Sequence, residues 1–323
     1  MLNRIADSLF WLGRYTERAE NLARAVDVHY HYLLEINDGE GERAAVQAAW
    51  WLVSALSGVE EVYATMQAQP ATDEMLRLLV TDSSNPNAIL ACVGRARENA
   101  SAVREHISSE MWEELNKFYL QLLDMSLGEA DVQTSPYDWF YEIKTRLQLF
   151  QGVTDATMLR GENWEFVQAG KFLERGDQTA RLMRARYRAL LEGPADAGEA
   201  VSFHQWMALL KSCSGYEAYR WVYRRVTPER VAELLLLNDQ FPRSVRFCCR
   251  RLQAALRSIA RAGRSDAQPA PGPGAAACAG VMEILNIADI NVIWPQGMQE
   301  CLDNVIDGFA AVDLAIFQEY FAA

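Results

Sequence analysis

Apolar residues recur along this chain at spacings of three and four, and runs that alternate apolar with polar residues are almost absent. Such spacing places the apolar side chains on one face of an α-helix. The clearest instance predicts a long helix from Asn3 to Ile36, which ends at Asn37-Asp38-Gly39. A second long helix is predicted from Asn163 to the stop signal at Gly193-Pro194. The sequence therefore predicts an all-α fold.

Further segments with helical spacing follow each long helix in the same order. In the first half, helices are predicted over residues 43–67, 72–80, 86–107, 109–124 and 137–159. In the second half, they are predicted over residues 199–225, 228–237, 242–262, 279–291 and 295–321. The stretch from 263 to 277 is rich in Pro and Gly and is predicted to be a flexible loop.

The chain also repeats itself, because residues 13–35 return at residues 170–192 without a gap. The matched positions include Gly13, Glu17, Arg18, Ala23 and Arg24 in the first copy and Gly170, Glu174, Arg175, Ala180 and Arg181 in the second. The match continues downstream, where Pro86 meets Pro242 and Cys92 meets Cys248 after one residue is dropped. A correspondence of this length indicates a duplicated domain.

The repeat sets the expected domain organisation. We expect two tandem helical bundles, residues 1–160 and 161–323, related by a pseudo-twofold axis with the long helices as central members. The predicted helix 137–159 ends a few residues before the second long helix begins, so only a short linker connects the two copies. The two bundles should therefore pack as one body.

Composition indicates a globular chain, since 50% of its 323 residues are apolar and 23% are charged. No apolar run approaches the roughly 18 residues that a membrane span needs, and Arg4, Asp7 and Arg14 stand where a signal peptide would be apolar. We therefore expect no membrane segment and a cytoplasmic location. The six cysteines contain no CxxC pair, so they are expected to be reduced and mostly buried.

Charge is unevenly distributed. The net charge of −12 argues against general nucleic-acid binding, but residues 181–264 contain 15 Arg and one Lys against seven acidic residues. These arginines either pair with acidic segments folded against them or form a face for an anionic ligand or an acidic partner such as a peptide. Guanidinium groups suit the second role because they bind carboxylate and phosphate bidentately.

Familiar catalytic signatures are absent from the sequence. It has no Walker-type phosphate loop, no GxSxG elbow and no dinucleotide GxGxxG. A di-metal site in a helical bundle needs Glu-x-x-His pairs, but a valine stands three residues before each of the four histidines, His29, His31, His106 and His204. We therefore expect no metal site and no cofactor, and we expect the histidines to be structural or surface residues.

The candidate site is the polar arc that the two long helices share. Glu17 and Glu174 are the candidate acid/base residues. The candidate ligand-binding residues are Arg14, Arg18, Asn21, Arg24, Arg175, Gln178 and Arg181. Three readings remain open: a buried or interfacial ion-pair network, a solvated helix face, and a ligand or catalytic site. If the arc is buried, Glu17 must pair with a guanidinium group.

Two pairs of repeated glycines bear on the same question. Gly13 and Gly170 lie one turn before the Glu-Arg pairs, where a glycine costs about 1 kcal/mol against alanine. Their presence predicts that something approaches the backbone closely, most simply another helix. Gly58 and Gly215 suggest the same for the second predicted helix of each copy.

Three segments carry a resemblance to a known family. Residues 9–20 (LFWLGRYTERAE), their echo at 170–175 (GKFLER) and residues 241–245 (FPRSV) resemble the alpha-E family, bacterial helical proteins named for a Glu-Arg motif. The resemblance covers essentially the whole chain. The second copy departs from the first at Lys171 and Phe172, where the first has Arg14 and Tyr15. Any site in the second copy is therefore expected to be weaker or purely structural.

The resemblance implies a functional setting. Alpha-E proteins are typically encoded beside, or fused to, circularly permuted ATP-grasp proteins, which activate a carboxylate and form an amide. We therefore expect an accessory subunit in peptide synthesis or protein modification, which binds an ATP-grasp partner or holds an acidic peptide group. Two alternatives remain: an enzyme that acts on an amide or peptide through Glu17, and a purely structural bundle that self-assembles into a homo-oligomer.

Overall fold

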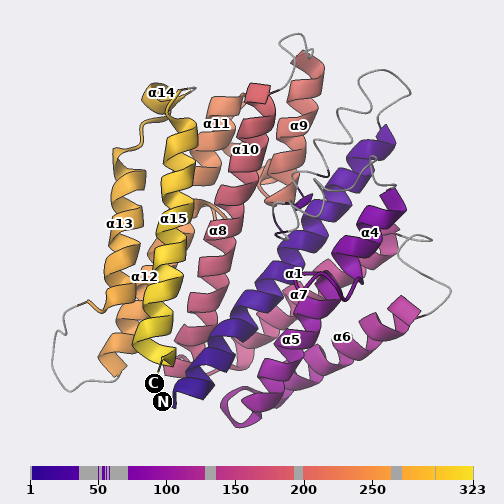
Figure 1. Ribbon diagram of the computed structural model, residues 1–323, viewed down its shortest axis with the longest axis vertical. Helices are drawn as coiled ribbons and strands as arrows, with labels where there is room; N and C mark the ends of the chain where they lie inside the picture. Colours follow the sequence, from indigo (N-terminus) through magenta and orange to yellow (C-terminus); the bar gives the residue numbers. More distant parts are fainter. Residues whose placement is uncertain are drawn as a thin grey trace.

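The computed structural model describes residues 2–35, 50, 53–54, 56, 58, 72–127, 136–192, 199–262, 271–294 and 296–322. All regular secondary structure in these ranges is helical, which confirms the all-α prediction (Figure 1). The division into two tandem bundles with a boundary near residue 160 stays a prediction.

Two long helices form the centre of the molecule. Helix α1 (Asn3–Glu35) and helix α8 (Glu162–Glu192) pack against each other and diverge toward their C-terminal ends, as Figure 1 shows. Helix α9 (Glu199–Ser212) contacts both of them. Helix α1 is buried on more than its apolar face, since Leu9 and the polar Glu17 are both fully buried.

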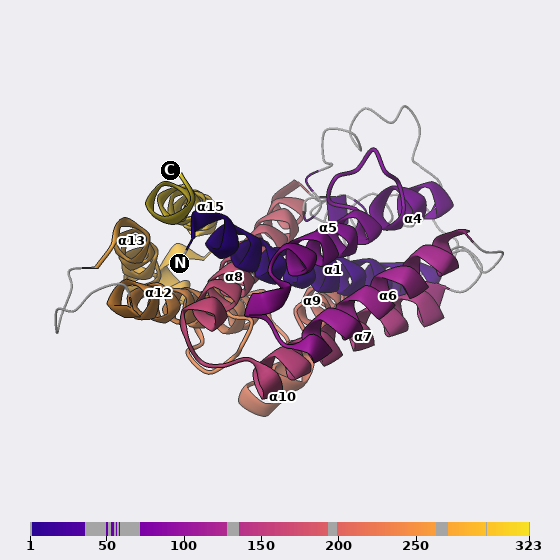
Figure 2. The same cartoon turned by 90° about the horizontal axis from the view of Figure 1, so that it is seen from below.

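The rest of the first half lies on α1. Helix α5 (Ile89–Ala102) and helix α7 (Pro136–Thr157) pack directly against α1, and α6 (Ser109–Leu127) packs on both of them (Figure 2). Helix α4 (Thr72–Val80) contacts α1 and α5, and a 3₁₀ turn, η1 (Arg104–His106), precedes α6. Only a short connection separates α7 from α8.

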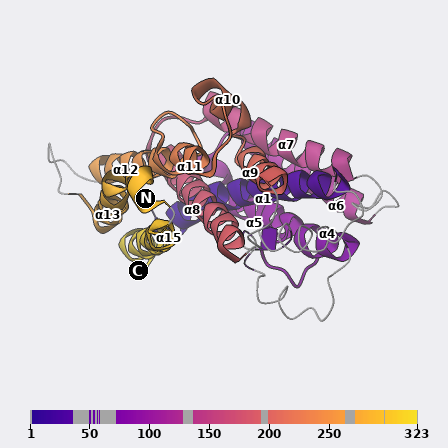
Figure 3. The same ribbon diagram turned by 90° about the horizontal axis from the view of Figure 1, so that it is seen from above.

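In the second half, the longer helices after α9 are arranged around α8. Helices α12 (Val245–Ala262) and α15 (Met298–Ile316) pack against α8, and α13 (Pro273–Ile287) packs on both (Figure 3). The remaining short elements are α10 (Tyr216–Val222), α11 (Pro228–Ala232) with the π-helical segment η2 (Glu233–Leu237), α14 (Ile290–Ile293) and the C-terminal π-helical segment η3 (Phe317–Phe321).

Several predicted boundaries are wrong for local reasons. The helix predicted over 199–225 breaks at Ser214 and Gly215, because Ser214 adopts a φ of 50° and the chain turns before α10. Gly215 therefore lies between two helices and not inside one. Gly58 likewise has a positive φ, of 69°, and so does not continue a regular helix either. The loop predicted over 263–277 ends early, since Pro273 begins α13. Most of the helix predicted over 43–67 lies outside the described residues.

One continuous apolar core joins the two halves. The six cysteines are buried and free, as predicted. None of the described helices combines the length and apolar character that crossing a bilayer requires.

Candidate functional site

The crossing of α1 and α8 is closest at two glycines. A Cβ atom added to Gly13 would lie 2.2 Å from the carbonyl oxygen of Val167, and one added to Gly170 would lie 2.0 Å from that of Phe10. Neither distance leaves room for a methyl group, so only glycine permits this backbone approach. The predicted close approach of another helix at Gly13 and Gly170 is confirmed.

One turn beyond the glycines, Glu17 of α1 is completely buried. Arg175 of α8 donates to both of its oxygens, from Nε to Oε1 and from Nη2 to Oε2, at 2.7 Å each. Arg243 donates to Oε1 at 3.0 Å, and Gln151 of α7 donates to Oε2 at 3.2 Å. Glu17 therefore accepts four hydrogen bonds, two on each oxygen.

Glu174 of α8 is bound in the corresponding way from α1, and its exposed fraction is 2%. Arg18 donates from Nε to Oε1 at 2.6 Å and from Nη2 to Oε2 at 3.0 Å. Arg14 donates to Oε2 at 2.9 Å, and Gln178 donates to Oε1 at 2.9 Å. Each Glu-Arg pair of the sequence thus exchanges partners across the crossing, and Glu174 also accepts four hydrogen bonds.

These contacts fix the protonation of both carboxylates. Burial alone would raise the pKa of Glu174, but Arg18 and Arg14 outweigh it and lower that pKa to about 2. Burial also acts to raise the pKa of Glu17, and Arg175 with Arg243 lowers it well below the usual range. Both side chains are therefore ionised at neutral pH.

A second ring of polar residues surrounds Glu17, and we call this group the Glu17 side. Buried Glu20 accepts from Arg243 at 2.7 Å, from Gln151 at 2.7 Å and from Arg24. Arg243 also donates to Asn21. The Glu17 side comprises Glu17, Glu20, Asn21, Arg24, Gln151, Lys171, Arg175 and Arg243.

The surroundings of Glu174, here the Glu174 side, are different. Arg14 donates a second bond, from Nη1 to Asp313 of α15 at 2.8 Å, and Arg18 donates from Nη1 to Asn87 at 2.6 Å. The Glu174 side comprises Arg14, Arg18, Asn87, Glu174, Gln178 and Asp313. The Glu174 side therefore connects α1 with α15.

Two cations on the Glu17 side are incompletely paired. Lys171 forms no ion pair with a residue that the structure describes. Burial lowers the pKa of Lys171, and Arg175 lowers it further, while Glu17 acts in the opposite direction. Arg24 donates to Glu20, but its buried Nε has no hydrogen-bond partner among the residues with described positions. Positive charge therefore exceeds negative charge on the Glu17 side.

The structure brings together most of the predicted site residues. Arg14, Arg18, Asn21, Arg24, Arg175 and Gln178 all lie at the crossing with the two glutamates. Arg181 lies further along α8 and donates to Asp177 at 2.7 Å.

Sequence reasoning missed five members: Glu20, Asn87, Gln151, Arg243 and Asp313. A signal existed for two of them, since Asn87 and Arg243 directly follow the repeated prolines, Pro86 and Pro242.

The geometry excludes one of the three readings of the arc and favours another. The solvated-face reading is wrong, because both glutamates are buried. A carboxylate offers about four acceptor positions, and all four are occupied in Glu17 and in Glu174. Neither group has a free position for a substrate proton, which favours an ion-pair network that fixes the crossing. Among the described residues, no group of three His, Cys, Asp or Glu side chains is arranged to hold a metal ion.

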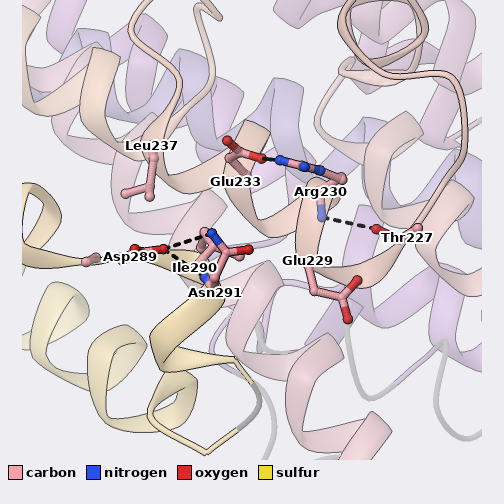
Figure 4. A pocket seen from close by; sticks show the side chains of 9 residues that line it. Thr227, Glu229, Arg230, Glu233, Leu237, Asp289, Ile290 and Asn291 are labelled. Atoms are coloured by element: carbon pink, nitrogen blue, oxygen red, sulfur yellow. Dashed lines mark hydrogen bonds and ion pairs between the residues drawn. The ribbon is translucent and has the colours of Figure 1, made fainter.

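A separate cavity of about 400 Å³ lies between α11, η2 and α14 (Figure 4). Its polar lining includes Glu229, Arg230, Glu233 and Asp289, and Arg230 donates to Glu233 at 2.5 Å. Asp289 accepts from the backbone N–H of Asn291 at 2.9 Å and so caps α14. Arg230, Glu233 and Asp289 therefore serve local structure, and none of the predicted site residues lines this cavity.

Comparison with known proteins identifies the family. Residues 1–321 match the Alpha-E family, described as a predicted alpha-helical domain with a conserved ER motif. The chain therefore belongs to the Alpha-E family.

Relatives include uncharacterized protein Rv2567 of Mycobacterium tuberculosis and uncharacterized protein Mb2597 of Mycobacterium bovis. Each is 26% identical over 271 residues, which cover 79% of this chain and 30% of the relative. The chain thus spans less than a third of these relatives. No solved structure is significantly similar to it.

Proposed function

We propose that this Alpha-E chain is a non-catalytic accessory subunit of an ATP-grasp-linked system for peptide synthesis or protein modification in the cytoplasm. The observation that carries the proposal is the saturation of Glu17 and Glu174 by four hydrogen bonds each. A carboxylate held in this way stabilises a fixed arrangement of helices and is a poor general acid or base. In this proposal, the two glutamates hold the two halves of the chain in a fixed arrangement. The partner then binds the outer surfaces of these halves.

The same contacts support a tandem, pseudo-twofold arrangement. Glu17 pairs with Arg175 as Glu174 pairs with Arg18, and these residues are equivalent in the sequence repeat. Gly13 meets Val167 as Gly170 meets Phe10, and those positions are equivalent too. An experimental structure in which the two halves fail to superpose would contradict this arrangement.

Exposed arginines support an acidic partner. Part of the basic segment is neutralised internally, since Arg184 pairs with Asp303 and Arg250 with Asp239. Arg257 and Arg261 lie exposed on α12 and form no ion pair with any described residue. Such a face suits carboxylates of a partner protein or of an acidic peptide.

The lengths of the relatives fit a subunit role. The matched region is 30% of the mycobacterial proteins, so most of each of those chains lies outside it. A helical unit that works beside other domains is compatible with both a separate chain and a fused one.

Association with a circularly permuted ATP-grasp protein from the same genome tests the proposal. We expect the purified chain to retain this protein in a pull-down and to change its rate of ATP turnover. Arg257→Glu combined with Arg261→Glu should weaken retention, and Arg250→Glu serves as the control because Arg250 is already paired with Asp239. No association and no change in ATP turnover would contradict the proposal.

A second experiment separates the accessory role from catalysis by the chain itself. Glu17→Gln should lower the melting temperature strongly, because Arg175 would lose its carboxylate partner. If Glu17 were a catalytic acid or base, the same variant would abolish turnover of an amide substrate and leave the melting temperature nearly unchanged.

A further inference from the structure

A buried arginine, to which no described residue supplies a counter-charge, lies between the diverging ends of α1 and α8. Arg186 of α8 has an exposed fraction of 3%, and its Nε atom has no hydrogen-bond partner in the described part of the chain. No acidic side chain that the structure describes forms an ion pair with it. A buried, unpaired charge costs several kcal/mol, so a positive group in this position calls for a compensating anion.

The groups around Arg186 are aromatic or neutral. The guanidinium carbon lies 4.8 Å from the ring centroid of Trp206 on α9. The indole Nε1 of Trp206 is also buried, and no residue that the structure describes accepts a hydrogen bond from it. A charged donor and a neutral donor thus lie in one cluster, and neither has an acceptor among the described residues.

Two residues of α1 complete the cluster without adding negative charge. Buried His29 holds its Nδ1 2.8 Å from the carbonyl oxygen of Ala25, so Nδ1 is the donor. Burial, together with the positive charge of Arg186, lowers the pKa of His29 to about 4, so the ring is neutral at pH 7. Burial raises the pKa of Tyr32, which keeps this hydroxyl neutral as well.

Arg186 itself keeps its charge. Burial lowers the pKa of its guanidinium to about 10, which is still well above neutral pH. The cluster therefore holds one full positive charge, together with N–H groups that face no acceptor of the described chain. Water could satisfy the N–H groups but could not balance the charge.

We propose that Arg186, with the ring and the indole N–H of Trp206, binds a single carboxylate between α1, α8 and α9. The planar guanidinium matches a carboxylate bidentately, and the indole ring suits the apolar carbon atoms beside it. A phosphate carries about −1.5 to −2 at neutral pH, so one cation would leave it partly uncompensated. This site is separate from the Glu-Arg crossing and does not depend on the proposed function.

Acetate serves as the probe. Sodium acetate is titrated against sodium chloride at matched ionic strength, and binding is measured by saturation transfer from the protein to the acetate methyl group and by melting temperature. The wild-type chain should show saturable transfer and a saturable rise in melting temperature. Arg186→Met should lose both responses, and Arg188→Met, an exposed arginine two residues along the same helix, should keep them.

Further variants define the ligand and its donors. Arg186→Lys keeps the charge but loses the bidentate fork and should weaken acetate binding about tenfold or more. Trp206→Phe keeps a ring but removes the N–H and should weaken binding about tenfold. No saturable response in the wild type, or an equal response in Arg186→Met, would overturn the proposal. Tighter binding of inorganic phosphate than of acetate would overturn the assignment to a carboxylate.

Stability in chloride buffer gives an independent readout. Without acetate, Arg186→Met should melt at or above the wild-type temperature, because an apolar side chain replaces an unbalanced buried charge. A large drop would show that the chain itself supplies a counter-charge to Arg186, and that result would also overturn the proposal.

Discussion

The two sides of the crossing bind their carboxylates with the same number of hydrogen bonds but differ in charge. On the Glu174 side, two cations face two acids: Arg14, Arg18, Glu174 and Asp313. On the Glu17 side, four cations face two acids: Arg24, Lys171, Arg175, Arg243, Glu17 and Glu20. The first side balances, whereas the second carries excess positive charge even when Asp155, which raises the pKa of Lys171, is counted as a third acid.

The difference arises outside the duplicated Glu-Arg pairs. At equivalent places in the repeat, Asn87 stands on the Glu174 side where Arg243 stands on the Glu17 side, and Arg14 corresponds to Lys171. Asn87 accepts from Arg18, whereas Arg243 donates to Glu17. The inner contacts hold the helices together, and the residues around them can change without loss of the crossing. Four predictions test whether the two sides respond differently.

Removal of either carboxylate should have the largest effect. Glu17→Gln should lower the free energy of unfolding by about 3–5 kcal/mol, because Arg175 remains buried beside Lys171 and Arg243 without Glu17. Glu174→Gln should cost less, since Arg14 keeps its partner Asp313. Urea unfolding at pH 7 measures both values. Equal losses of unfolding free energy in the two variants would show that the excess positive charge on the Glu17 side does not affect stability.

Acid should weaken the crossing through the same groups. The pKa of Glu174 lies at about 2 in the folded state against a reference of 4.5, so its contribution is complete above pH 4.5 and is lost as the pH falls toward 2. Urea unfolding of the wild type between about pH 5 and pH 2 should therefore show a steeper loss of stability than that of Glu174→Gln. Parallel curves for the two proteins would contradict this assignment.

The two glycines should respond alike, in contrast to the two carboxylates. Gly13→Ala and Gly170→Ala should each lower the free energy of unfolding by about 1–3 kcal/mol, because each methyl group would overlap a carbonyl oxygen of the other helix. Gly152→Ala in α7 is the control, since nothing lies within 4 Å of its added Cβ atom. That change should stabilise the helix by about 0.5–1 kcal/mol. If one of the two substitutions lowered the free energy of unfolding much less than the other, the helices would be able to move apart at that glycine without much loss of stability.

The smallest effect is expected at Lys171. Lys171→Met should leave the free energy of unfolding unchanged or raise it by up to about 1 kcal/mol, because it removes a half-buried charge that faces Arg175. The equivalent change Arg14→Met should lower stability, since Glu174 and Asp313 both lose a donor. Thermal unfolding of the two variants measures the difference. Similar losses would indicate that Lys171 has a stabilising partner.

Much of this architecture follows from the sequence because helical periodicity and the repeat are local signals. The helix at 72–80 has the predicted bounds, and the glycines at 13 and 170 correctly indicated a helix contact. The exchange of partners between Glu17 and Glu174 was not predictable, because it depends on the crossing geometry. Asp313 likewise comes from a helix distant in sequence, with nothing in its local pattern to indicate Arg14.

The missed break at residue 214 has a local cause. The sequence around Ser214 and Gly215 keeps helical spacing on both sides, so periodicity alone joins α9 to α10. The dipeptide Ser-Gly is itself a turn signal. The observed φ of 50° at Ser214 shows that the chain forms the turn here instead of continuing the helix.

The bond between Arg14 and Asp313 has a consequence for how the chain folds during synthesis. The two residues are 299 positions apart, and the ring of Phe10 also lies 5.4 Å from that of Phe321. Asp313 must therefore leave the ribosome before the last contacts around α1 can form. Contacts of such high sequence separation form slowly, so part of the surface that α1 buries in the folded protein stays uncovered until then.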